Sequence, residues 1–121
     1  MTLEHFRTPG GASAWLHIRP DTNDHNTAFS ALNEDEYRLP PVSGIAWDIG
    51  AHIGSVTIAL LLDNPALQVI AVEPVPDNVS VAARNFLSTG VWNRVTLIAG
   101  AVGNGDVTVA YGFRGNEVAE H

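Results

Sequence analysis

The residues in this sequence whose types and spacing suit chemistry surround one glycine-bearing stretch, IAWDIGAHIGSVTIALLL, at residues 45–62. An apolar run reaches Asp48, glycines follow at Gly50 and Gly54, and an apolar run of helical character then resumes. A second carboxylate, Glu73, ends the next apolar run. A strand, a glycine loop and a helix in this order predict a site for a nucleotide-like ligand. The loop backbone can approach the ligand closely, and the first N–H groups of the helix can face it.

The elements that must position these residues alternate between strands and helices. Strands are expected at residues 44–49, 68–73, 94–100 and 107–112, and helices at about 54–62 and 76–89. Pro76 suits the first position of the second helix, and Gly90 lies just past its end. The first strand is apolar on both faces, which is typical of a parallel strand covered by helices on both sides. The order therefore predicts an α/β fold with a doubly wound parallel sheet.

The first 43 residues predict a separate N-terminal segment. Alternating apolar and polar residues follow a turn at residues 9–11, which indicates a short β-hairpin. Asp24 is a candidate N-cap for a following helix, and the two prolines at positions 40 and 41 would end this unit. We therefore divide the chain into a hairpin and helical segment, residues 1–43, and a partial Rossmann-like domain, residues 44–121.

Composition narrows the classes of function. The 121 residues are 45% hydrophobic, carry a formal net charge of −7 and include no cysteine. This charge opposes non-specific binding to nucleic acid or anionic membranes and favours a small-molecule ligand. The sequence shows no signal-peptide pattern and no apolar run of about 18 residues, so a cytoplasmic protein is expected. The histidines lack the spacing of metal ligands, so no metal site is expected.

Two ligand classes fit the glycine loop. A dinucleotide-binding fingerprint, G-x-G-x-x-G, starting at Gly50 needs glycines where this sequence has His52 and Ser55. A methyltransferase loop has an acid near the strand end and then glycines at alternate positions. In that register the sequence supplies Asp48, Gly50 and Gly54, and His52 is the one departure. The second pattern is favoured, and an NAD-binding Rossmann domain stays the weaker alternative.

Three motifs together resemble the FkbM family of S-adenosylmethionine-dependent methyltransferases, namely WDIGAHIGSVTIAL, VIAVEPVPDNV and NRVTLIAGAVGN. Upstream, RPDTND at residues 19–24 and the pair Glu36 and Tyr37 are similar to further elements of that family. The resemblance spans about residues 19–111. It implies a Rossmann-like class I methyltransferase fold and S-adenosylmethionine as the cofactor. It also implies O-methylation of a hydroxyl on a small molecule or sugar, and leaves the particular acceptor open.

The predicted cofactor site rests on chemistry and on this resemblance. A carboxylate at Glu73 can accept hydrogen bonds from both ribose hydroxyls, each worth roughly 1.5–3 kcal/mol. By resemblance, Pro74 and a turn at Gly100 and Ala101 supply the walls of the adenine site. The complete predicted set is Asp48, Gly50, Ala51, His52, Gly54, Glu73, Pro74, Gly100 and Ala101.

Structural roles compete with functional ones at two of these positions. Asp48 could merely cap the loop by bonding local N–H groups, and the two roles can coexist. His52 could contact the amino-acid end of the cofactor or act as a base, although a plain loop side chain is the more frequent role at such a position. The sequence therefore identifies no catalytic base.

One part of the FkbM pattern is absent from the sequence. In that family the fourth core strand ends in D-x-E-G, and this motif does not occur here. Without that strand, residues 45–49 would form an unpaired sheet edge, and such edges invite self-association. We therefore expect an incomplete sheet. A non-catalytic cofactor-binding half, which needs further chain or a partner, is the alternative to an active methyltransferase.

Overall fold

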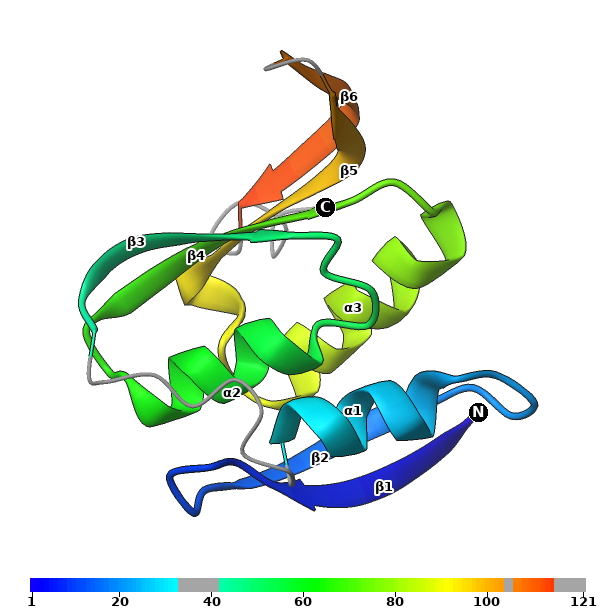
Figure 1. The fold of residues 1–121 in the computed structure, drawn as a ribbon, viewed down its shortest axis with the longest axis vertical. Coiled ribbons are helices and arrows are strands. Elements are labelled where there is room, and N and C mark those ends of the chain that lie inside the picture. Colours follow the sequence, from blue (N-terminus) through cyan, green and yellow to red (C-terminus); the bar gives the residue numbers. More distant parts are fainter. Residues whose placement is uncertain (33–41, 104–105, 115–121) are drawn as a thin grey trace.

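Figure 1 shows a layered α/β structure. The computed structural model describes residues 1–32, 42–103 and 106–114. A four-stranded sheet forms one layer, two helices form the next, and a β-hairpin with a third helix packs on the far side of those two helices. In chain order the elements are β1 (Thr2–Arg7), β2 (Ser13–Ile18), α1 (Asp24–Leu32), β3 (Gly44–Ile49), α2 (Ser55–Asp63), β4 (Leu67–Glu73), α3 (Pro76–Ser88), the 3-10 turn η1 (Trp92–Arg94), β5 (Val95–Gly103) and β6 (Asp106–Arg114).

The larger sheet has the strand order β3-β4-β5-β6. Strands β3, β4 and β5 are parallel, and β6 runs antiparallel to β5. The α/β class and the parallel sheet expected from the sequence are therefore confirmed. Within the described part of the chain, β3 pairs with β4 alone, so it lies at the edge of the sheet.

Helix cover on both faces of this sheet was expected, and here the structure differs. The three parallel strands lie side by side in chain order, and right-handed crossovers then put both connecting helices on the same face. Figure 1 shows α2 and α3 on that face. On the other face the side chains of Ile45, Trp47 and Ile49 are 64%, 57% and 54% exposed. An apolar pattern alone could not reveal this, because it does not say what covers each face.

The hairpin and helix expected in the first 43 residues are confirmed as β1, β2 and α1. Alternate residues of β2, namely Ala14, Leu16 and Ile18, are buried and join the core formed with α2 and α3. The hairpin segment thus shares one hydrophobic core with the rest of the chain. The domain boundary at residue 44 stays a prediction. Glu36, Tyr37, Pro40 and Pro41, to which the sequence analysis gave roles, lie outside the described ranges.

Helix α2 is held at its C-terminal end by partners distant in the chain. Arg94 donates hydrogen bonds to the carbonyls of Leu61 at 2.8 Å and Asn64 at 3.1 Å. Asp63 accepts from the Thr8 hydroxyl at 2.6 Å and from the Gly10 N–H at 3.0 Å, both in the hairpin turn. These contacts fix the direction of the helix, and its opposite end then points at the glycine loop. None of the described helices is both long and apolar enough to span a membrane.

Candidate cofactor site

The predicted site residues meet at one edge of the sheet. Parallel strands end on the same side, and the register pairs Asp48 with Ala71 and Glu73 with Ala99. The ends of β3, β4 and β5 therefore lie next to one another. This is the edge at which open α/β sheets bind their ligands.

The glycine loop, residues 50–54, is tied to the neighbouring strand by its own backbone. The N–H groups of Gly50 and Ala51 both donate to the carbonyl oxygen of Val72, at 2.8 and 3.0 Å. Gly50 has a φ of 78°, and a Cβ built on it meets no atom within 4 Å. Gly50 is thus an exposed, open position that suits a ligand approaching the backbone.

Gly54 is required for a different reason. Its φ is 90°, and a Cβ at this position would lie 2.5 Å from Cε1 of Phe86 in α3. The glycine therefore lets α2 begin directly against α3. Because a glycine in this position offers no side-chain cap, the first N–H groups of α2 have no cap acceptor from that residue. Such a helix end favours a carboxylate or another anionic group.

Asp48 points toward α2. Its Oδ2 accepts a hydrogen bond from the Thr57 hydroxyl at 2.6 Å. Burial raises the pKa of Asp48, and the hydrogen bonds from Thr57 only partly oppose that rise. The side chain thus joins β3 to α2, a structural role that leaves the predicted cofactor contact untested.

Glu73 is the most heavily bonded of the predicted residues. Its side chain is buried, with 4% of the residue exposed. Oε1 accepts from the His52 N–H at 2.8 Å, and Oε2 accepts from the Val75 N–H at 3.0 Å and from Asn78 Nδ2 at 3.1 Å. A carboxylate has about four acceptor positions, so three are used by the protein itself. Glu73 therefore holds the glycine loop to the start of α3, in addition to any ligand contact.

His52, which breaks the glycine pattern, occupies a left-handed backbone conformation with a φ of 55°. Its Nε2 lies 3.5 Å from Oδ1 of Asp24, while Nδ1 is buried and has no hydrogen-bond partner. The ring lies against a buried carboxylate of the N-terminal segment, and one nitrogen is left to pair with another group.

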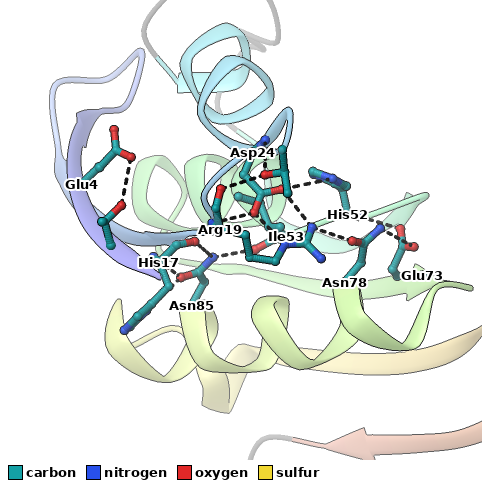
Figure 2. Close-up of polar contacts among 11 residues, drawn as sticks. Glu4, His17, Arg19, Asp24, His52, Ile53, Glu73, Asn78 and Asn85 are labelled. Carbon is teal, nitrogen blue, oxygen red and sulfur yellow. Dashed lines mark hydrogen bonds and ion pairs between the residues drawn. The ribbon is translucent and has the colours of Figure 1, made fainter.

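Figure 2 shows the network that surrounds this histidine. Asp24, whose side chain is 0% exposed, accepts three hydrogen bonds from Arg19, at 3.0 Å from N, 2.8 Å from Nε and 2.9 Å from Nη2. Burial opposes ionisation of Asp24, but the hydrogen bonds and charge of Arg19 outweigh it and lower the pKa of Asp24. The expected N-cap role is wrong, because α1 begins at Asp24 itself and the Asp24 carboxylate accepts from Arg19, while its N–H donates to the Thr22 hydroxyl at 3.1 Å.

Two contributors to the site were missed at the level of sequence. Asn78, at the start of α3, accepts from Arg19 Nη2 at 2.7 Å and donates to Glu73. Asn85, fully buried in the same helix, accepts from the His17 N–H at 2.6 Å and donates to the Ile53 carbonyl at 3.0 Å. Asn78 stands in VIAVEPVPDNV, one of the three motifs of the family resemblance, which was a signal for it, whereas nothing in the local pattern distinguishes Asn85.

The residues expected to wall the adenine site are differently placed. Pro74 is exposed just after β4. Gly100 and Ala101 do not form a turn, as was expected, but lie within β5 and pair with Val109 and Thr108 of β6. An irregularity between Ala99 and Gly100 shifts the register there, which is where the parallel part of the strand ends. The turn was implied by the family resemblance, which does not show the pairing of β5 with β6.

The arrangement defines a class of protein. A strand, a glycine loop and an uncapped helix, beside a second strand that ends in a carboxylate, form the nucleotide half-site of Rossmann-like proteins. The open space over Gly50 and the unpaired Nδ1 of His52 fit a polar ligand lying over this loop.

Comparisons with known proteins identify the family. A model of the precorrin methyltransferase domain matches residues 37–106, more than half of the chain. The chain belongs to this family, whose members use S-adenosylmethionine as the methyl donor. No curated protein matches the sequence.

Two solved structures have a similar fold. Precorrin-6Y C5,15-methyltransferase from Geobacter metallireducens GS-15 is 22% identical with a TM-score of 0.53, and the match covers 69% of this chain and 43% of that one. The C-terminal domain of precorrin-6Y C5,15-methyltransferase from Rhodobacter capsulatus is 25% identical with a TM-score of 0.50, and the match covers 71% and 44%. This chain thus spans less than half of either.

The expectation of an S-adenosylmethionine-dependent methyltransferase is supported, whereas its assignment to the FkbM family is not. The motifs that carried the FkbM resemblance lie mainly in the cofactor half, around the glycine loop and the carboxylate of the second strand. The matching family model covers residues 37–106, which include these motifs, so the motifs alone did not distinguish the two families.

Proposed function

We propose that this chain binds S-adenosylmethionine at the edge formed by β3, β4 and β5 and serves methyl transfer. The observation that carries the proposal is the glycine loop held between Val72 and Glu73, with the uncapped start of α2 behind it. In this proposal the first N–H groups of α2 bind the carboxylate of the cofactor, and the remaining acceptor position of Glu73 takes a ribose hydroxyl. Gly50 has no side chain, so the cofactor can lie directly against the backbone of the loop. The cofactor supplies an electrophilic sulfonium methyl group.

The acceptor is proposed on the family match. The family description and the names of both structural neighbours point to a precorrin-type macrocycle. A hydroxyl of a small molecule or sugar, which the FkbM resemblance implied, is the second candidate. Transfer of an isotopically labelled methyl group to each class of acceptor, followed by mass spectrometry, would distinguish the two candidates.

We also propose an alternative role for the 121 residues by themselves, namely cofactor binding without turnover until another polypeptide adjoins β3. The exposed edge of that strand and the coverage of less than half of each structural neighbour support it. The same edge supports the proposal that the chain self-associates.

The decisive experiment is calorimetric titration of the chain with S-adenosylhomocysteine, with NAD as a parallel ligand. We expect selective binding of S-adenosylhomocysteine. A Glu73→Ala variant should bind it about tenfold more weakly or worse, because a charge-assisted bond contributes roughly 1.5–3 kcal/mol. Equal binding of NAD, or no binding by a folded chain, would overturn the proposal.

A further inference from the structure

The N-terminal segment reaches the proposed cofactor site through a chain of partly buried polar contacts. We define the Asp24 network as Arg19, Asp24, His52, Glu73 and Asn78. Asp24 and Arg19 come from the hairpin and helix segment, and the other three residues come from the Rossmann-like part. Figure 2 shows the side chains converging between α1 and the start of α3.

Two routes lead from Asp24 to the two oxygens of Glu73. The first runs through Arg19 and Asn78 to Oε2, with hydrogen bonds of 2.9, 2.7 and 3.1 Å. The second runs through the ring of His52, 3.5 Å from Asp24, and from the His52 N–H to Oε1 at 2.8 Å. Each oxygen of the carboxylate therefore accepts from a residue that the N-terminal segment contacts, while Oε2 also accepts from the Val75 N–H.

The chemistry of the donors makes the first route directional. A guanidinium can only donate, so Asn78 must turn its carbonyl oxygen toward Arg19. Its amide nitrogen then faces Glu73, which can only accept when ionised. Arg19 thus fixes the orientation of the Asn78 amide. Lysine could still pair with Asp24, but a single ammonium cannot reproduce the planar fork that serves Asp24 and Asn78 together.

We propose that Arg19 and Asp24 are positioning residues for the cofactor site, acting through Asn78 and His52 to orient the carboxylate of Glu73 toward the ribose. This inference rests on the proposed function and assigns to the hairpin and helix segment a part in cofactor binding. A segment that served only the hydrophobic core would need no ion pair between a buried aspartate and an arginine that also bonds to the Asn78 amide.

The test measures how strongly each variant distinguishes S-adenosylhomocysteine from its 2′,3′-dideoxy analogue by calorimetry. The wild-type chain should prefer the natural ligand about tenfold or more, because only that ligand has ribose hydroxyls. In Arg19→Lys this preference should shrink by about fivefold, as the carboxylate loses its fixed orientation. Glu4→Gln is the matched control, because Glu4 pairs with His25 in the same segment but lies outside the network. It should keep the full preference.

The outcomes separate the inference from the function on which it rests. If the wild-type chain does not bind S-adenosylhomocysteine, the proposed function fails and the inference fails with it. If it binds and Arg19→Lys keeps the full preference, only the inference is overturned. Should Arg19→Lys not fold, Asn78→Ala decides, since it leaves the Arg19–Asp24 pair intact and breaks the route to Glu73. An unchanged preference in that variant would likewise overturn the inference.

Discussion

Replacement of Glu73 by glutamine tests whether one carboxylate holds the glycine loop in place. Its three hydrogen-bond partners in the structure are the N–H groups of His52 and Val75 and the side-chain amide of Asn78, and all three are donors. Glutamine retains one acceptor oxygen but replaces the other with an NH₂ group, which can only donate. It can satisfy the two partners of Oε2, and its own NH₂ then faces the N–H of His52.

The magnitude follows from these contacts. Two bonds change from charge-assisted to neutral, which costs about 1 kcal/mol each, and the buried N–H of His52 loses its acceptor at a cost of about 1–3 kcal/mol. Removing a buried charge returns part of the desolvation cost of the carboxylate. We expect the free energy of unfolding to fall by about 2–4 kcal/mol, which for a chain of this size lowers Tm by roughly 6–24 °C.

Thermal unfolding followed by circular dichroism measures this shift, with Glu4→Gln as the control. Glu4 is 35% exposed at its side chain and pairs with His25 at the surface. Its replacement should change the unfolding free energy by at most about 1 kcal/mol. If Glu73→Gln unfolds within about 2 °C of the control, Glu73 does not hold the loop. The reasoning about the network would then be refuted.

Three further predictions follow from named contacts. Gly54→Ala should lower the free energy of unfolding by about 3 kcal/mol or more, since it adds a clash with Phe86 to the cost of a positive φ. Gly90 has a φ of 77° and open space around it, so Gly90→Ala should lower the free energy of unfolding by only about 1–2 kcal/mol, measured by urea unfolding. Equal losses of stability in the two variants would contradict the clash. The raised pKa of Asp48 means that its ionisation destabilises the folded state, so Asp48→Asn should raise Tm at neutral pH. This gain in Tm should shrink as the pH falls toward the ordinary pKa of 3.8, and a gain that does not change with pH would contradict a raised pKa at Asp48. Trp47→Lys, on the exposed face of the edge strand, should lower any self-association measured by analytical ultracentrifugation, and an unchanged mass distribution would exclude this face.

The stability of the fold depends on pH in opposite directions at two carboxylates, because the pKa of one is lowered and that of the other is raised. The pKa of Asp24 is lowered, so its pair with Arg19 contributes stability at neutral pH, and that contribution is lost as the pH falls through the lowered value. The pKa of Asp48 is raised, so stability from that site instead increases on acidification.

Local sequence patterns were enough to predict most helices and strands of this protein. Pro76 and Gly90 marked the ends of α3 because each residue suits one end of a helix by its backbone geometry. Gly50 and Gly54 marked the loop because their positive φ angles are costly for other residues. These are properties of a residue and its immediate neighbours, so they can be read along the chain.

The partners of the polar side chains, in contrast, depend on how distant parts of the chain pack together. Arg19 meets Asn78 across 59 positions, and His17 meets Asn85 across 68, because the hairpin packs against α3. The same packing places Asp24, expected as a helix cap, at the centre of a partly buried network. The order of the strands left one face of the sheet without a helix among the described residues. Local sequence cannot fix such contacts, because they depend on how separate elements pack together.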